Sequence, residues 1–321
     1  MKITRFFIFC SLSLIFTFAS AYSVDARAPK TEKIVFSSNR RGNWDIYVMN
    51  PDGKNQVRLT KSPLVDVSPV WSPTGEQILF VSYRDGIRDL YVMDADGRHL
   101  RRVFRNSARR SEPAWAPDGE RIVFHAELPQ WSIQTATIHG RDVRIVASAD
   151  PRGGNPSWSP DGTEIAYVDD VGGSRRIRIV TLNSGEIRTF LPKASSWMYT
   201  PAWSPDGERL AFTWYKWGIG DKDALFIANR DGSRLKQIGK AVPGTSSPAW
   251  SPAGDKIVYM EEAREGDRQI AIIDINSKRK KELTHRGWNI TPSWFDPAFV
   301  TLPVAPQPHL LTTVWGEIKA D

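Results

Sequence analysis

Residues 156–162 read Pro-Ser-Trp-Ser-Pro-Asp-Gly, and related stretches recur along the chain at nearly constant spacing. Each repeat carries a Pro-x-Trp triplet, and the spacings between successive tryptophans are 44, 43, 45, 47 and 44 residues. These tryptophans are Trp71, Trp115, Trp158, Trp203, Trp250 and Trp294. In the first five repeats, a Ser-Pro or Ala-Pro pair follows the tryptophan, and a glycine comes two residues after the proline. Proline presets φ for a type I turn, and glycine accepts positive φ at the end of the turn. Each repeat therefore begins with an extended segment that ends in a tight turn.

A short apolar strand follows each turn, as at Ile78-Leu79-Phe80 or Ile122-Val123-Phe124. A further strand, such as Asp89-Leu90-Tyr91-Val92-Met93, leads through an Asp-Gly turn to an outermost strand. Four short strands every ~40–45 residues are typical of a propeller blade. Six copies predict an all-β fold, a six-bladed β-propeller.

The two ends of the repeat region are incomplete in complementary ways. Residues 33–60 supply three strands without a Pro-x-Trp strand before them, and residues 291–294 supply a Pro-x-Trp strand without a blade after it. We therefore expect the C-terminal strand to become the innermost strand of the N-terminal blade, which closes the ring and removes two open sheet edges. The predicted propeller spans 32–296, between an N-terminal arm (22–31) and a Pro-rich linker and C-terminal tail (297–321).

Composition excludes several classes of protein. The chain has 321 residues, of which 40% are apolar, enough to build a core and to exclude wholesale disorder. A single cysteine excludes a disulfide scaffold and any multi-cysteine zinc or iron–sulfur site. The net charge of +7 is spread over a long chain, which by itself does not indicate a nucleic-acid binder.

The first 21 residues have the pattern of a signal peptide. Lys2 and Arg5 precede an apolar run of 13 residues (6–18), and Ala19-Ser20-Ala21 has the small-x-small pattern of a cleavage site. The run is shorter than the ~20 residues that span a bilayer, although an uncleaved N-terminal anchor is an alternative. We predict a periplasmic or secreted protein, cleaved near Ala21, with no nucleic-acid partner and no membrane insertion of the mature chain.

The repeat pattern resembles that of a known family. The stretches Ile34-Val35-Phe36, Trp44-Asp45-Ile46-Tyr47 and Trp71-Ser72-Pro73 are similar to the WD40-like repeats of the TolB propeller. The resemblance covers about 32–296 and implies a six-bladed propeller. TolB is a periplasmic component of the Tol–Pal envelope system whose propeller binds a peptidoglycan-associated lipoprotein, so the resemblance also implies an envelope partner. We expect only the propeller part here, without TolB's N-terminal α/β domain.

Similar repeats also form the propellers of prolyl oligopeptidase-type serine peptidases. Those enzymes need a hydrolase domain of their own, and this sequence contains no Gly-x-Ser-x-Gly nucleophile elbow. The sequence therefore argues against a peptidase.

One face of the propeller is predicted to carry the longer and more varied loops, which join second to third strands and blade to blade. Function concentrates on variable loops held by a rigid scaffold, and aromatic and arginine side chains dominate binding hot spots. The predicted binding residues on this loop face are Trp131, Trp197, Tyr199, Trp214, Trp217, Trp288, Arg84, Arg110 and Arg286. We predict a protein or peptide of the cell envelope as partner, and the arginines favour an acidic one.

A polar ring is predicted around the channel axis, from the residue before each repeated proline: Ser68, Glu112, Asn155, Thr200, Ser247 and Thr291. Six-bladed lactonases are similar in placing a divalent cation at the axis, on Glu, Asn and Asp ligands. This ring has one carboxylate and no aspartate, a poor ligand set for a hard cation. We therefore expect a binding module without metal, cofactor or catalytic residues. A lactonase-like hydrolase and a binder of cell-wall glycans remain as alternatives.

Overall fold

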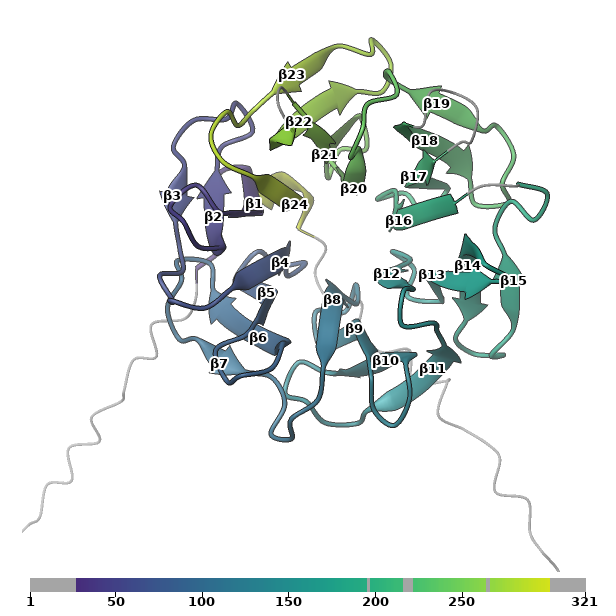
Figure 1. Ribbon diagram of the computed structural model, residues 1–321, viewed down its shortest axis with the longest axis horizontal. Coiled ribbons are helices and arrows are strands. Elements are labelled where there is room, and N and C mark those ends of the chain that lie inside the picture. The colour runs from purple at the N-terminus through teal and green to yellow at the C-terminus, as the bar shows by residue number, and fades with distance from the viewer. Residues whose placement is uncertain (1–26, 195–196, 216–221, 264–265, 301–321) are drawn as a thin grey trace, which may run out of the picture.

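The computed structural model describes residues 27–194, 197–215, 222–263 and 266–300. They form six four-stranded antiparallel sheets around a central channel, which confirms the predicted propeller (Figure 1). The predicted signal peptide lies outside the described residues, as do most of the tail and half of the arm. Among the described residues, none belongs to a helix that is long and apolar enough to cross a membrane.

Every blade repeats the same order of strands from the channel outward. The innermost strands are β24 (Asn289–Phe295), β4 (Asp66–Trp71), β8 (Arg110–Trp115), β12 (Gly154–Trp158), β16 (Trp197–Trp203) and β20 (Ser246–Trp250). The second strands are β1 (Lys33–Ser38), β5 (Gln77–Ser82), β9 (Arg121–Ala126), β13 (Glu164–Val171), β17 (Arg209–Tyr215) and β21 (Lys256–Glu262). The third strands are β2 (Asp45–Met49), β6 (Asp89–Asp94), β10 (Ser132–Thr137), β14 (Ser174–Thr181), β18 (Asp223–Asn229) and β22 (Arg268–Asp274). The outermost strands are β3 (Val57–Arg58), β7 (Arg101–Arg102), β11 (Arg144–Ser148), β15 (Ile187–Thr189), β19 (Lys236–Ile238) and β23 (Lys280–Glu282).

The ring closes within one blade, which we number blade 1 and which consists of β24, β1, β2 and β3. Strand β24 pairs antiparallel with β1 from Lys33 opposite Phe295 to Ser38 opposite Asn289 (Figure 1, yellow beside purple). Apolar side chains of blade 6, Ile270 among them, pack against those of blade 1 in one buried cluster. The predicted closure by the C-terminal strand is therefore confirmed, by hydrogen bonding within the blade and by packing between blades.

Each innermost strand contains a bulge at the residue before its proline. These six residues have positive φ between 47° and 55°, a region that few residues other than glycine adopt and that is least favourable for β-branched threonine. They are Ser68, Glu112, Asn155, Thr200, Ser247 and Thr291. A bulge re-aims the side chain it carries, and here it directs all six toward the channel.

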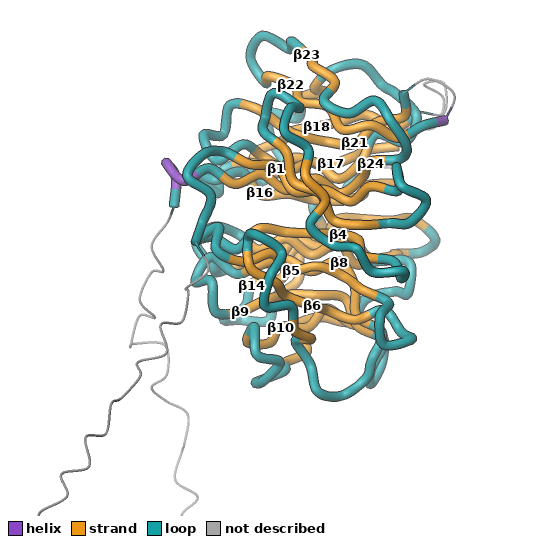
Figure 2. The backbone as a smooth tube through the Cα atoms, turned by 90° about the vertical axis from the view of Figure 1, so that its left-hand side faces the viewer, coloured by secondary structure: helices purple, strands orange, loops and turns teal. Residues whose placement is uncertain are grey.

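The described ends of the chain lie together on the face of tight turns. Ala28 and Val300 pack against the same buried cluster, which contains Trp71 and Phe295. The single-turn helix η2 (Pro297–Phe299) lies beside the turn prolines, at the left of Figure 2. The loop face, on the opposite side, is thus clear of both described ends.

Loss of the closing strand should destabilise the whole ring. Phe295 is 4% exposed and its ring centroid lies 5.6 Å from that of Trp71. Phe295→Ala should therefore cost ~3–5 kcal/mol, a large part of the ~5–15 kcal/mol that stabilises an ordinary domain. Trp294→Ala should cost less, because Trp294 is only half-buried. Truncation after Asn289 should lower the melting temperature more than either substitution. A chain that ends at Val300 is the control and should melt like the parent. If the chain truncated after Asn289 also melts at the parent's temperature, the closure is contradicted.

Candidate functional site

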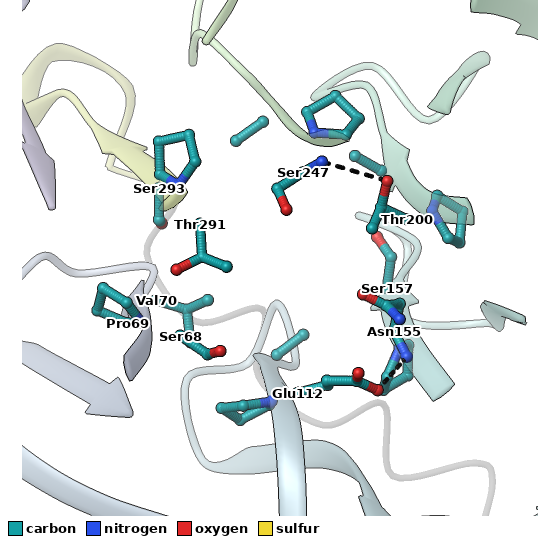
Figure 3. A pocket seen from close by; sticks show the side chains of 18 residues that line it. Ser68, Pro69, Val70, Glu112, Asn155, Ser157, Thr200, Ser247, Thr291 and Ser293 are labelled. Carbon is teal, nitrogen blue, oxygen red and sulfur yellow. Dashed lines mark hydrogen bonds between the residues drawn. The ribbon is translucent and has the colours of Figure 1, made fainter. Parts of the chain in front are cut away.

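The channel contains a cavity of about 200 Å³ lined by three consecutive residues from each innermost strand. Each blade contributes the bulge residue, its proline and the residue that follows, so Glu112, Pro113 and Ala114 line it from blade 3. Figure 3 shows the polar side chains of the six bulge residues around this space. The structure therefore brings together all six residues of the predicted polar ring.

Hydrogen bonds link three of the ring residues to the preceding blade. In each of these bonds, the backbone N–H of one ring residue donates to a side-chain oxygen of the preceding blade. The three bonds run from Asn155 N to Glu112 Oε2 (2.7 Å), from Ser247 N to Thr200 Oγ1 (3.3 Å) and from Ser68 N to Ser37 Oγ (3.0 Å; the first two are dashed in Figure 3). Two of the six ring side chains, those of Glu112 and Thr200, thus help to join the blades.

Glu112 is the one ionisable residue of the ring. Burial raises the pKa of its carboxyl, while the N–H of Asn155 and the charges of Arg88 and Arg175 act in the opposite direction. The described part of the chain has no group of three or more His, Cys, Asp or Glu side chains placed to hold a metal ion. Glu112 is therefore a carboxylate without the neighbouring ligands that a metal ion needs among the described residues.

His125 of β9 lies directly behind Glu112. It is 2% exposed, its Nδ1 is 4.0 Å from Glu112 Oε2, and its ring centroid lies 4.7 Å from that of Trp131, with the rings tilted by 37°. Burial, followed by the charge of Arg88, lowers the pKa of His125 to about 4. Gly154 makes room for this arrangement, because a Cβ there would lie 2.0 Å from Glu112 Oε2 and 2.9 Å from His125 Nδ1. A glycine is thus required where blade 4 approaches the Glu112–His125 pair.

The sequence analysis did not single out His125, although the repeats contained a signal for it. His125 occupies the position of Val81 in blade 2 and Ser37 in blade 1 when the second strands are aligned on their phenylalanines. Ser37 Oγ lies 2.9 Å from the Oγ1 of Thr291, the ring residue of its own blade. This position therefore lies behind the ring. Blade 3 differs from blades 1 and 2 in placing a histidine there.

Two of the predicted binding arginines are parts of the scaffold, which corrects the prediction. Arg84 donates to both carboxylate oxygens of Asp66, at 2.9 and 3.0 Å, and lies 5.1 Å from the ring of Tyr91. Arg40 lies 4.7 Å from the Tyr47 ring in blade 1, so Arg84 is a repeated structural residue.

Arg110 is 5% exposed, between Asp89 at 3.0 Å and the ring of Phe104 at 3.8 Å. Its charge is neutralised inside the protein. It is therefore inaccessible to a partner.

Trp214 is also a core residue. It is 6% exposed on β17, and its ring centroid lies 5.1 Å from that of Phe226 in the cluster between blades 4 and 5. Its burial corrects the prediction that it is an accessible loop-face residue. Trp217 lies outside the described residues.

The remaining predicted aromatic residues lie at the surface or half-buried, and each has a guanidinium over its ring. The pairs are Arg88 with Trp131 (5.5 Å), Arg175 with Trp197 (5.8 Å) and Tyr199 (5.1 Å), and Arg268 with Trp288 (5.1 Å). Trp288 is 39% exposed, and neighbouring Arg286 is exposed as well. Arg268 was not among the expected binding residues, although it occupies the repeat position of Arg88 and Arg175, six residues before the end of the third strand. Among the described residues, no carboxylate lies within 4.0 Å of any of these four arginines.

The buried histidine makes stability depend on pH. The pKa of His125 in the folded protein, about 4, lies below the ordinary value of 6.5, so the unfolded chain binds more protons between these values. As the pH falls through this window, protonation of the unfolded chain should therefore lower the free energy of unfolding by roughly 3 kcal/mol. Urea unfolding of His125→Gln should show a smaller decrease than the parent. His285→Gln is the control, because His285 is exposed, and it should lose as much unfolding free energy on acidification as the parent does. If His125→Gln loses as much as the parent, His125 does not have this role.

Comparison with known proteins agrees with the geometry. The family model described as TolB beta propeller domain matches residues 13–153 and 125–298. A stretch of 49 residues is 47% identical to the Tol-Pal system protein TolB of Geobacter sulfurreducens, over 15% of this chain and 11% of that protein. TolB of Acinetobacter baumannii superposes with a TM-score of 0.71 at 19% identity, over 82% of this chain and 66% of that one.

A putative TolB of Agrobacterium tumefaciens superposes with a TM-score of 0.64 at 20% identity, over 81% of this chain and 91% of that one. The chain thus spans slightly less than two thirds of the Acinetobacter protein and a small part of the Geobacter one. At these identities the superpositions show the shared fold, and the family model covers most of the chain. The protein belongs to the TolB β-propeller domain family.

Proposed function

We propose that this protein is an exported TolB-like propeller that binds a protein or peptide of the cell envelope through its loop face. The observation that carries the proposal is the set of arginine–aromatic pairs on that face, around Trp131, Tyr199 and Trp288. Aromatic and arginine side chains contribute most of the binding energy in protein interfaces.

One property of these pairs favours binding over a purely structural role. Arg88, Arg175 and Arg268 share one repeat position, six residues before the end of the third strand, so recurrence does not separate these pairs from Arg40–Tyr47 and Arg84–Tyr91. Their arginines, however, have no carboxylate of the described chain within 4.0 Å, whereas Arg84 and Arg110 are neutralised by buried aspartates. Rings that hold the guanidinium in place reduce the entropy lost when a partner binds.

The cellular setting is part of the proposal. The Geobacter relative is named as a Tol–Pal system protein, and we extend an envelope setting to this chain. The N-terminal pattern up to Ala21 supports export, to the periplasm or the exterior. The position of both described chain ends on the tight-turn face leaves the loop face accessible to a partner.

Replacing Trp288 should weaken binding without affecting the fold. Trp288→Ala should cost ~2 kcal/mol of binding free energy, a loss of about thirtyfold in affinity, while the melting temperature stays close to that of the parent. The measurement is capture of partners from an envelope extract on immobilised mature protein, followed by titration of the captured partner. Leu64→Ala is the matched control, because Leu64 is 42% exposed and lies in a blade-to-blade loop. Equal capture by parent and Trp288→Ala would remove Trp288 from the interface. A parent that retains nothing specific would contradict the proposed function.

A further inference from the structure

The polar ring of the channel contains side-chain atoms that no other described residue uses. Glu112 accepts the N–H of Asn155 through Oε2 (2.7 Å), and its other oxygen makes no hydrogen bond with the described residues. The Ser68 hydroxyl and the side-chain amide of Asn155 likewise have no hydrogen-bond partner in the described part of the chain. Figure 3 shows the second Glu112 oxygen and the Ser68 hydroxyl directed into the cavity, with Ser68 and Asn155 on either side of Glu112. Three neighbouring blades, 2, 3 and 4, therefore present free hydrogen-bonding atoms at one side of the channel.

The residues that line this cavity favour a positively charged ligand. Of the described residues, those in the lining include one ionisable side chain, Glu112, and no lysine, arginine or histidine. Each innermost strand has a free edge toward the channel, and its proline contributes a carbonyl but no N–H to that edge. A lone carboxylate is a poor site for a divalent metal ion, and the described part of the chain has no group of three or more His, Cys, Asp or Glu side chains placed to hold one. An organic cation fits this lining better than a metal ion does.

Beyond the ring, the cavity has an apolar wall. The six prolines that follow the ring residues are buried, and Val70, Ala114, Ala202 and Ala249 continue the wall from the next position. The volume of about 200 Å³ exceeds the ~150 Å³ of an engineered cavity that holds benzene, a six-carbon ligand. The cavity therefore has room for an alkyl chain of about five carbons beside the polar ring.

We propose that the channel binds a primary alkylammonium ion, with its ammonium group on Glu112 and its alkyl chain along the prolines. An ammonium group has three N–H donors and no acceptor, which matches the free oxygens of Glu112, Ser68 and Asn155. Hydrogen bonds between charged partners are about twice as strong as those between neutral ones. The methylene groups of such a ligand pack against apolar surface while its charged end stays among polar groups. The aromatic residues of the proposed interface lie outside this lining, so the site is additional to the proposed function.

The charge of Glu112 makes this binding depend on pH. Burial raises the pKa of its carboxyl, while the N–H of Asn155 and the charges of Arg88, from the loop before β6, and Arg175, from β14, act in the opposite direction. His125, behind Glu112 on β9, is neutral above its own pKa of about 4. Neither of these two described arginines has a nitrogen within 4.0 Å of a Glu112 oxygen, whereas a bound ammonium is in direct contact with it, and Coulomb energy falls with distance. Binding should therefore weaken as pH falls and Glu112 is protonated, because an alkylammonium keeps its proton up to a pH of about 10.

Isothermal titration calorimetry of the mature protein with n-pentylammonium chloride, at about pH 7.5 and constant ionic strength, tests the site. We expect saturable one-to-one binding, at least about tenfold tighter than that of methylammonium, because the shorter ion lacks the methylene groups that contact the wall. Glu112→Gln should weaken binding by about tenfold or more and remove its dependence on pH. Glu120→Gln is the matched control, because Glu120 is exposed in the tight turn of the same blade and its replacement changes the net charge equally. Melting temperatures verify that each variant is folded.

A second ligand separates the two sources of the ammonium group. If acetyl-Gly-Lys-Gly-amide binds as tightly as n-pentylammonium, and Glu112→Gln weakens both, the site takes a lysine side chain of a partner. If the free amine alone binds, the site takes a small amine; both outcomes support an ammonium site. Absence of n-pentylammonium binding at millimolar concentration, or equal weakening by Glu120→Gln, would overturn the site. Tighter binding of calcium or of n-pentanol than of n-pentylammonium would overturn its assignment to an ammonium group.

Discussion

The pairing of β24 with β1 is the contact on which the rest of the structure depends. It joins residues 289–295 to residues 33–38 and supplies blade 1 with its innermost strand. Without it, the apolar cluster between blades 6 and 1 would lose the packing of Ile290 and Trp294, and β1 would present an unpaired edge. Because a closed ring places equivalent positions of all blades around one axis, the channel and its polar ring exist only when this pairing forms.

The bulges then convert a repeat into a site. Each innermost strand holds a residue with positive φ before its proline, and this turns six side chains into the channel. Part of the polarity there is structural, since the oxygens of Thr200 and of Ser37, which lies behind the ring, accept hydrogen bonds from the next blade. Blade 3 differs, because Glu112 and His125 bring titratable groups to positions that hold hydroxyls in blades 1 and 5.

The arginines divide by their partners. Arg58 and Arg84 lie against buried aspartates and hold loops to the blades, so their charge is neutralised inside the protein. Arg88, Arg175 and Arg268 lie over aromatic rings instead, with no carboxylate of the described chain within 4.0 Å.

The sequence alone was enough to predict the blades, their number, the closing strand and the members of the polar ring, because these depend on period and on turn chemistry, which are local. It was insufficient to separate binding residues from scaffold: Trp214 and Arg110 looked like loop-face residues and are 6% and 5% exposed. Burial and ion pairing depend on which side chain of a neighbouring blade lies opposite, as Asp89 does for Arg110. Such neighbours are distant in the chain, and only the folded ring, by fixing the distance between blades, decided which of these charges were neutralised inside the protein.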